Sequence, residues 1–349
     1  MYSPPPHLAA LARASQVAGA DPDLVQGAGG NSSVKCGGVL WVKASGCWLS
    51  DALTSQIFVP LSLAAVRDNI EAGAPDPCRD ALMRDLAEDD KRPSIEASLH
   101  ALMPHNAVFH THSVNATVAV ILAGGAERAC RALESNMRVA CVPYVRPGPP
   151  LTAAIKSVID SDGVPDVVLL GNHGVVVGAD SPDEAIVLLR EVERRLSFPP
   201  RTLPEADPIV ALAFGTGDYR FHPQSSGLAL DPFTLGLLTG QALVPDQVVF
   251  LGGAAERVAT DESLDAAAER VWQKARVRPT LLLVPGVGAF VRRDCSEGAS
   301  SVLSWLVEIA RRIPAGSAIT GLPGGEVASL LGWEAEQYRQ KLDQQRQTA

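Results

Sequence analysis

The chain has 349 residues, of which 46% are hydrophobic, 20% charged and only 5% aromatic, and its formal net charge is −9 at pH 7. This length suffices for two domains, and the composition is that of a folded globular protein rather than a disordered or fibrous one. The acidic balance argues against nucleic acid as a partner, because no basic face is evident that could displace counterions from a polyanion.

Cysteines and targeting signals point to the cytoplasm. The six cysteines are scattered, without a CxxC pair or the spacing of a disulfide framework. The N-terminal segment lacks the basic and then apolar order of a signal peptide, and no apolar run reaches the roughly 18 residues of a membrane span. We therefore expect reduced thiols, a cytoplasmic location and no membrane association.

The N-terminal part predicts two helices separated by a glycine-rich segment. Apolar residues recur at helical spacing over residues 6–19. The segment 27–46, GAGGNSSVKCGGVLWVKASG, contains a short apolar strand at 39–42. Its glycines alone fit a tight turn, a nucleotide loop or a phosphate cradle. Residues 93–104 predict a second helix, with Ser94 as its N-cap.

Strands and helices then alternate. Apolar, β-branched runs predict strands at 107–113 and 139–145, and residues 166–179 read as two strands flanking a GNHG turn. The segment SPDEAIVLLREVERRL predicts a helix capped by Ser181 or Asp183.

The proline-rich segment 199–208 has no periodicity and predicts a linker. It would separate a first domain, 1–198, from a smaller α/β domain, 209–349. In the second domain, residues 246–253 look like a strand, and 280–293, TLLLVPGVGAFVRR, look like a hairpin. A dinucleotide site is disfavoured there, because the GxGxxG fingerprint is absent.

A later helix in this domain carries an apolar stripe. The stripe is expected to pack on the sheet of its domain or on another subunit. It consists of Val302, Leu303, Leu306 and Ile309.

Histidines in two strand contexts are the strongest chemical signal. His110 and His112 stand at i and i+2 of one strand, so both imidazoles project from one face. His173 lies in the second context, in a turn where Gly171 and Gly174 allow close approach. Three neutral imidazoles suffice for a catalytic zinc ion with an open position. The alternative is that the pair merely forms hydrogen bonds at a strand end.

A carboxylate supplements the histidines. Glu96 lies near the start of a predicted helix, where the helix dipole favours a negative charge. That position also suits a solvated acid with no catalytic role. His100 lies four residues on and on the same helix face, so it could support the site or simply pack.

Taken in order, these motifs resemble the class II aldolase/adducin family over about residues 8–196. The similarity rests on GAGGNSS, WVKASG, PSIE, AVFHTHS, VPYVRPG and NHGVVVG followed by an acidic helix. The aldolase domain of long rhamnulose-phosphate aldolase-like proteins is most similar. The resemblance implies a three-layer α/β/α domain around a mostly antiparallel sheet. It also implies a homo-oligomer, such as a tetramer, with sites between subunits.

The resemblance also assigns residues. It implies that His110, His112 and His173 bind a divalent metal, generally Zn²⁺, and that Glu96 acts as the general base. The positions that match those holding a substrate phosphate are Asn31, Ser45, Gly46 and Ser94, with Gly29 shaping their loop.

The implied function is that of a zinc-dependent lyase acting on a small keto sugar or sugar phosphate through a metal-stabilised enediolate. A sugar-phosphate epimerase or a 3-keto-acid decarboxylase would use the same apparatus. A non-catalytic, adducin-like assembly module is the alternative from another class, and it predicts degenerate metal ligands. The ligands and the acid are intact here.

Two departures from the family pattern stand out. Ile95 occupies the place where the family often has a second serine, so one hydroxyl donor to phosphate is missing. Aldolases of the family protonate the leaving group with a tyrosine placed after the HxH pair, and none occurs here between His112 and Tyr144. Tyr144 is a conceivable substitute, but we prefer the interpretation that it is a strand tyrosine ending a core run.

Overall fold

The computed structural model describes residues 4–348 apart from 88–89 and 215–216. The chain forms two compact units, one of residues 1–120 and 124–197 and the other of residues 121–123 and 198–349. Residues 121–123 were expected in the first domain. In the second unit, Leu122 forms a β-bridge with Ile319.

Helices and strands of the first unit alternate along the chain. Their bounds are η1 Pro6–Leu8, α1 Ala9–Gly19, β1 Asn31–Cys36, β2 Val39–Lys43, η2 Leu49–Asp51, β3 Phe58–Ser62, α2 Leu63–Glu71, α3 Ala97–Leu102, β4 Ala107–Thr111, α4 Val114–Ile121, α5 Gly125–Leu133, β5 Val139–Val142, α6 Pro149–Asp162, β6 Val167–Leu170, β7 Gly174–Ala179 and α7 Pro182–Arg195.

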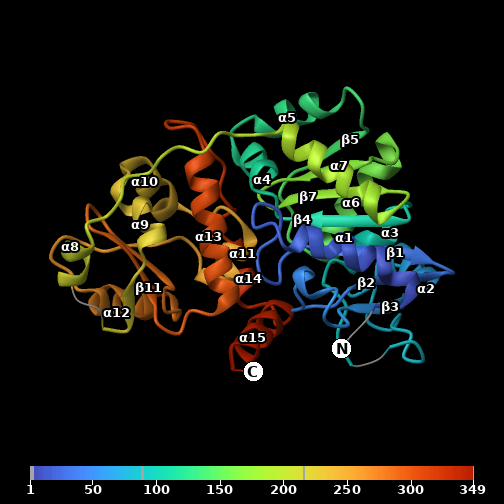
Figure 1. Ribbon diagram of the computed structural model, residues 1–349, viewed down its shortest axis with the longest axis horizontal. Helices are drawn as coiled ribbons and strands as arrows, with labels where there is room; N and C mark the ends of the chain where they lie inside the picture. The colour runs from blue at the N-terminus through green and yellow to red at the C-terminus, as the bar shows by residue number, and fades with distance from the viewer. Residues whose placement is uncertain (1–3, 88–89, 215–216, 349) are drawn as a thin grey trace. The chain divides into compact units, whose positions relative to one another are not determined.

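These strands form a single sheet in the order β3-β2-β1-β4-β7-β6-β5. Every neighbouring pair is antiparallel except β5 and β6. Helices α2, α3 and α6 pack on one face, while α1 and α7 pack on the other (Figure 1). The predicted α/β/α arrangement with a mostly antiparallel sheet is therefore confirmed.

Side-chain alternation along β4 decides which residues face α3. Val108 belongs to a buried cluster with Leu99 of α3 and Ile155 of α6. Because successive strand residues point to opposite faces, His110 shares the face of Val108, whereas Phe109 points to the other face. The first histidine of the pair is thus turned toward the layer that contains α3.

The expected helix over residues 93–104 begins later. Helix α3 starts at Ala97, with Glu96 rather than Ser94 at its N-cap position, so the predicted cap is wrong. The backbone before it is held alongside the end of β2 instead. Pro93 forms a β-bridge with Ala44, and the Ser94 N–H donates to the carbonyl of Lys43 at 3.0 Å. Tertiary pairing has overridden the local cap signal. For α7 the sequence left Ser181 and Asp183 as alternative N-caps. The N-cap is Ser181, whose hydroxyl accepts from the backbone N–H of Glu184 at 3.3 Å.

The second unit holds a smaller sheet among many helices. Its elements are α8 Pro208–Ala213, β8 Tyr219–Phe221, α9 Pro223–Leu230, α10 Pro232–Gly240, α11 Pro245–Leu251, β9 Glu256–Arg257, α12 Leu264–Ala275, β10 Leu281–Val284, β11 Gly288–Arg292, α13 Glu297–Arg312, α14 Glu326–Leu331 and α15 Glu334–Thr348. The strand order is β8-β11-β10-β9, and β10 and β11 form the predicted hairpin.

Two expectations for this unit are corrected. Residues 246–253 do not form a strand, because α11 occupies residues 246–251, with Pro245 in its first turn and left-handed Gly252 directly after its end. Every residue of α11 is buried, so its apolar run has no polar face that would reveal helical periodicity. The apolar stripe of α13 is buried, but it packs mainly against α9 and α11 rather than on the sheet.

The cysteines also differ from expectation. Cys130 of α5 and Cys141 of β5 form a disulfide, so the prediction of reduced thiols is wrong for this pair. Helix α5 packs against β5 and brings them together, which their spacing in the sequence does not reveal. The remaining four cysteines form no disulfide in the described part of the chain.

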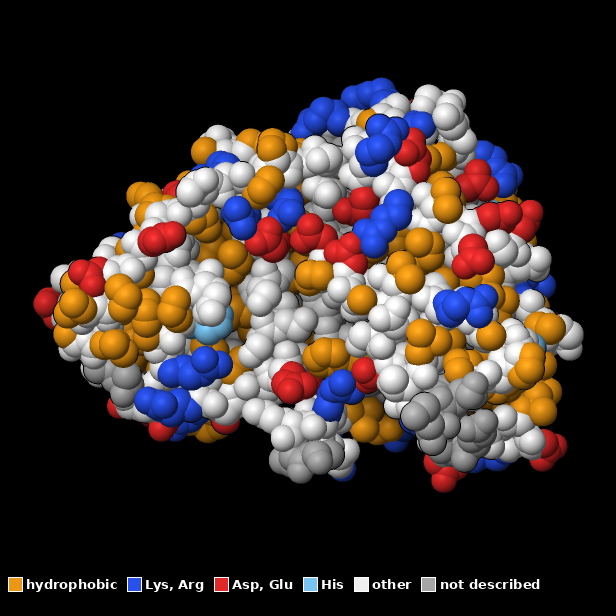
Figure 2. Space-filling model, in the orientation of Figure 1, with side chains coloured by type: hydrophobic (Ala, Val, Ile, Leu, Met, Phe, Trp, Pro, Cys, Tyr) orange, Lys and Arg blue, Asp and Glu red, His pale blue; other side chains and the backbone are white. Residues whose placement is uncertain are grey.

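The described residues contain no single helix that is long and apolar enough to cross a membrane. Helices α10 and α11 pass that test only as a pair, and they are bent by 84° at their junction. Over the face drawn in Figure 2, acidic and basic side chains of the described residues are interspersed without a continuous basic surface.

Candidate metal centre

Three histidine rings meet at one buried point of the first unit. His110 lies on β4, His112 follows the end of that strand, and His173 lies in the turn between β6 and β7. One ring nitrogen from each lies within 4.8 Å of the others, and all three side chains are buried. The ring centroids are between 4.7 and 5.1 Å apart.

The turn that carries His173 depends on its flanking glycines. A Cβ on Gly174 would lie 2.2 Å from the carbonyl oxygen of Thr111 on β4, and one on Gly171 would lie 2.6 Å from the backbone nitrogen of Tyr144. Asn172 adopts a positive φ of 54°, which asparagine tolerates better than most residues. Close backbone approach thus places His173 beside the other two rings.

A backbone hydrogen bond fixes the tautomer of His110. Its Nδ1 lies 3.1 Å from the carbonyl oxygen of Val175, which can only accept, so Nδ1 carries the proton. In the neutral ring the lone pair is then on Nε2. This arrangement is typical of histidines that bind a metal through the second nitrogen.

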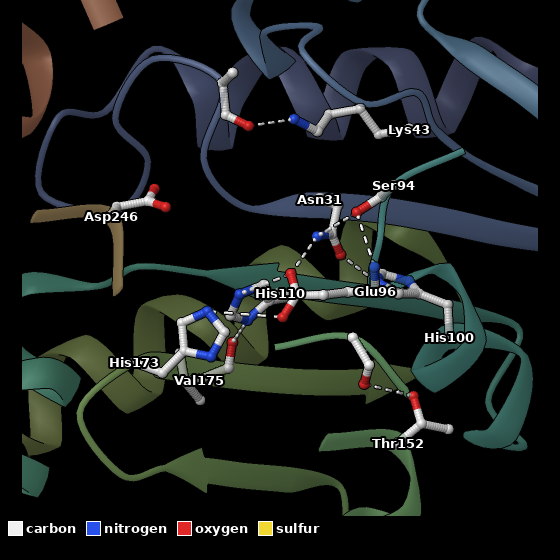
Figure 3. Close-up of polar contacts among 12 residues, drawn as sticks. Asn31, Lys43, Ser94, Glu96, His100, His110, Thr152, His173, Val175 and Asp246 are labelled. Atoms are coloured by element: carbon white, nitrogen blue, oxygen red, sulfur yellow. Dashed lines mark hydrogen bonds and ion pairs between the residues drawn. The ribbon is translucent and has the colours of Figure 1, made fainter. Parts of the chain in front are cut away.

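Glu96 faces the histidines from the N-terminal end of α3 (Figure 3). Its Oε2 lies 3.5 Å from Nε2 of His110, and its Oε1 lies 3.6 Å from Nε2 of His173. Burial alone would raise the pKa of Glu96, but the three neighbouring imidazoles and the Asn31 amide lower it to about 2. The carboxylate is therefore ionised at neutral pH.

This donor set fits a divalent metal. Buried carboxylate oxygens are normally hydrogen-bonded, yet Oε1 of Glu96 is buried without a hydrogen bond among the described residues. Three imidazole nitrogens and an adjacent carboxylate are the ligand types that zinc prefers. A cation held by the three imidazoles would offset the negative charge of this buried carboxylate.

Asn31 and His100 complete the polar cluster around Glu96. Asn31 is the residue of β1 opposite His110, and its Nδ2 donates to Oε2 of Glu96 at 2.9 Å and to Oγ of Ser94 at 3.2 Å. Its Oδ1 accepts from Nε2 of His100. His100, which the sequence left as either a support or a packing residue, is fully buried here, and its Nδ1 lies 2.8 Å from Oγ of Ser33.

The segments expected to hold a phosphate lie next to one another. The backbone N–H of Ser45 donates to the carbonyl of Arg92 at 2.8 Å, which brings residues 44–46 beside residues 92–94. Gly46 adopts a positive φ of 75° in the turn after β2. The Gly29 N–H, in contrast, donates to the carbonyl of Gln26 at 2.9 Å, so it closes a local turn.

Sequence reasoning missed Lys43 as part of this region. Although charged, it is only 2% exposed, and its Nζ donates to the carbonyls of Ala28 at 2.7 Å and Cys47 at 2.6 Å. Lys43 therefore joins the two loops that flank the predicted anion site. A lysine ending the apolar run VLWV was the available signal, because lysine is almost never fully buried without partners.

Tyr144 lies just beyond β5 and is half-buried. Its backbone runs beside Gly171, at the start of the turn that carries His173. The structure thus brings Tyr144 near that turn through its backbone.

Comparison with known proteins identifies the family of the chain. The family model described as "Class II Aldolase and Adducin N-terminal domain" matches residues 9–198. This match covers more than half of the chain, and the chain belongs to that family.

Individual relatives are more distant. "Uncharacterized oxidoreductase YuxG" of Bacillus subtilis (strain 168) is 30% identical over 202 residues, which are 52% of this chain and 28% of that protein. The chain thus spans less than a third of that relative's length. Among solved structures, the N-terminal class II aldolase domain of a conserved protein from Thermoplasma acidophilum is 25% identical, with 56% of this chain and 94% of that chain covered and a TM-score of 0.45. L-fuculose-1-phosphate aldolase from Thermus thermophilus is 16% identical, with coverage of 54% and 89% and a TM-score of 0.36.

Proposed function

We propose that this protein is a divalent-metal-dependent lyase that makes or breaks a carbon–carbon bond in a small keto sugar or sugar phosphate. The single observation that carries the proposal is the buried cluster of His110, His112 and His173 beside a carboxylate of Glu96 that has one oxygen without a hydrogen bond. Membership of the class II aldolase family supports the reaction class. We propose zinc as the metal, and a homo-oligomer such as a tetramer as the working assembly.

The three histidines would hold the cation. A bound divalent metal supplies Lewis-acid chemistry, because it polarises the hydroxyl and carbonyl oxygens of a keto sugar. The remaining chemistry falls to Glu96. In the direction of condensation, its ionised carboxylate takes a proton from the carbon next to the carbonyl, and the pair of electrons left on that carbon forms the new bond to the carbonyl carbon of an aldehyde. The C=O electron pair of the aldehyde moves to its oxygen, which takes up a second proton. In cleavage, Glu96 returns the proton to the same carbon.

Side chains around Glu96 would bind the rest of the substrate. The backbones of residues 44–46 and 92–94 lie side by side, and we propose that the hydroxyls of Ser45 and Ser94 and the turn at Gly46 donate to a phosphate or a sugar hydroxyl. The cluster is buried, so water is largely excluded from the point where the proton moves. Low exposure also strengthens the electrostatic interactions that orient the carboxylate.

Two measurements test the proposal on the full-length protein. Elemental analysis of the purified protein should find about one divalent metal per chain, and His110→Ala combined with His112→Ala should remove it. Exchange of the carbon-bound hydrogen of dihydroxyacetone phosphate in D₂O, followed by NMR, should depend on the metal. Glu96→Gln should keep the metal and abolish exchange. Absence of stoichiometric metal, or exchange that survives Glu96→Gln, would refute the proposal.

An epimerase or a decarboxylase of the same family would share the proton transfer by Glu96. Product analysis with a panel of ketose phosphates and 3-keto acids separates these reactions. A non-catalytic assembly module predicts normal oligomers but no exchange or turnover with any compound of the panel.

A further inference from the structure

A buried chain of hydrogen bonds ends on Oε2 of Glu96. Asn31 and Ser33 stand at i and i+2 of β1, so both project from the face that carries His110. His100 lies in α3, which covers this face, and contacts both side chains. The order of the chain is Ser33, His100, Asn31 and Glu96, and each of these residues is at least nine-tenths buried. Figure 3 shows the last three, His100, Asn31 and Glu96.

The chemistry of the partners fixes the direction of each hydrogen bond. A carboxylate only accepts, so the Asn31 group facing Glu96 must be its NH₂, and its Oδ1 must then face His100. Because Oδ1 also only accepts, Nε2 of His100 carries a proton and donates. Nδ1 of the neutral ring is then an acceptor, and the hydroxyl of Ser33 donates to it over 2.8 Å.

The electrostatics agree with a neutral ring. Burial, followed by the proximity of Lys35 and His110, lowers the pKa of His100 to about 3. A ring with one N–H cannot donate to Asn31 and Ser33 at once. The arrangement therefore has one consistent set of donors and acceptors.

We propose that His100 is a positioning residue, which fixes the Asn31 amide so that it holds Glu96 by one carboxylate oxygen. Both hydrogens of Asn31 Nδ2 are used, one on Oε2 of Glu96 and one on Oγ of Ser94. Oε1 of Glu96 is left as the oxygen turned toward His173. In the reaction proposed above, on which this role rests, Oε1 is the oxygen that takes the proton.

The role revises the assignment of Asn31. The family resemblance places its side chain on the substrate phosphate, whereas here both amide hydrogens and the amide oxygen are bound within the protein. The anion would then depend on other groups, such as the Ser45 hydroxyl. Loss of His100 should consequently change the rate of proton transfer rather than the affinity for the substrate.

A direct test reads out the Asn31 amide itself, without substrate. The chain contains six asparagines, so ¹⁵N-asparagine labelling gives few side-chain NH₂ signals, and Asn31→Ser identifies the one of interest. In the wild type, hydrogen exchange of this NH₂ with water should be slow. His100→Leu should speed it about tenfold or more, and His100→Gln, which retains an N–H donor, should restore part of the protection. His105→Leu is a matched control, because His105 bonds to Asp166 instead.

The second arm measures function on the same variants. His100→Leu should lower the maximal rate of hydrogen exchange on dihydroxyacetone phosphate by about 10- to 100-fold, as is usual for residues that orient catalytic groups. The concentration of dihydroxyacetone phosphate that gives the half-maximal rate should stay the same, and so should the metal content. Ser33→Ala, which loses only the outer bond, should have a smaller effect in the same direction.

The two arms separate the two proposals. If the wild type exchanges no hydrogen on the sugar phosphate, the proposed reaction fails, while the amide signal still decides whether His100 holds Asn31. If the Asn31 signal in His100→Leu matches the wild type, the positioning role is refuted. If His100→Leu does not fold, Ser33→Ala decides, and an Asn31 signal in Ser33→Ala equal to that of the wild type would refute the role.

Discussion

Replacing Lys43 tests whether one buried ammonium holds together the two loops of the predicted anion site. Its Nζ donates to the carbonyls of Ala28 and Cys47, at 2.7 and 2.6 Å, and the side chain is 2% exposed. Lys43→Met keeps most of the aliphatic stem but leaves both carbonyls without this donor. A hydrogen bond from a charged donor contributes about 1.5–3 kcal/mol.

The two bonds together would give about 3–6 kcal/mol, but removing a buried charge recovers part of the desolvation cost. We therefore expect Lys43→Met to lower the free energy of unfolding by about 2–4 kcal/mol. For a unit of this size, that corresponds to a fall in Tm of about 5–12 °C. The loss should also weaken binding of inorganic phosphate, because the loops at residues 27–30 and 44–47 are no longer tied.

Differential scanning calorimetry of the full-length protein measures the shift. Lys35→Met is the matched control, because Lys35 donates to a single carbonyl, that of His105, at 2.6 Å. Burial, with Arg67 nearby, lowers the pKa of Lys35 to about 7, so its charged form is already disfavoured and its loss should matter less. A Tm for Lys43→Met equal to that of the wild type would refute the reasoning.

Two further outcomes are expected. In the native protein, Ellman's reagent should react with exposed Cys36 but not with buried Cys78, whose thiol pKa is raised to about 12 by burial and by Asp76. After reduction of the disulfide, Cys130 and Cys141 should also react with the reagent. Rapid modification of Cys78 in the native protein would contradict its buried position. Gly174→Ala should prevent stable folding or metal binding, because its Cβ would lie 2.2 Å from a carbonyl oxygen of β4. Gly37 has open space around it and a φ of +58°, so Gly37→Ala should lower the free energy of unfolding by only about 1 kcal/mol. Equal destabilisation by Gly174→Ala and Gly37→Ala would be evidence against the close approach at Gly174.

Short-range patterns predicted much of the first unit. Strand alternation is a local property, so the spacing of His110 and His112 predicted that their rings project to the same side. No strand was predicted over residues 31–36, where β1 lies. The sheet order brings β1 beside β4, and that pairing depends on contacts far apart in the sequence. The direction of the Asn31 amide could not be predicted, because it is set by Glu96 and His100 from another element.

The errors have a common physical cause. Ser94 has the residue type of an N-cap, but its backbone is engaged by the end of β2, so tertiary hydrogen bonds decide where α3 begins. The run at 246–253 is rich in valine, and burial on all sides removes the polar stripe that would identify a helix. In both places the local signal was real, and a long-range contact outweighed it.

The disulfide between Cys130 and Cys141 makes the histidine cluster sensitive to the redox conditions around the protein. It ties β5, a strand at the edge of the sheet, to α5, and closing a loop of this size removes about 3 kcal/mol of chain entropy from the unfolded state. The end of β5 in turn accepts a hydrogen bond at 2.8 Å from Gly171, the first residue of the turn that carries His173. Reduction of this disulfide would therefore loosen β5, which supports the turn of His173, one of the three proposed metal ligands.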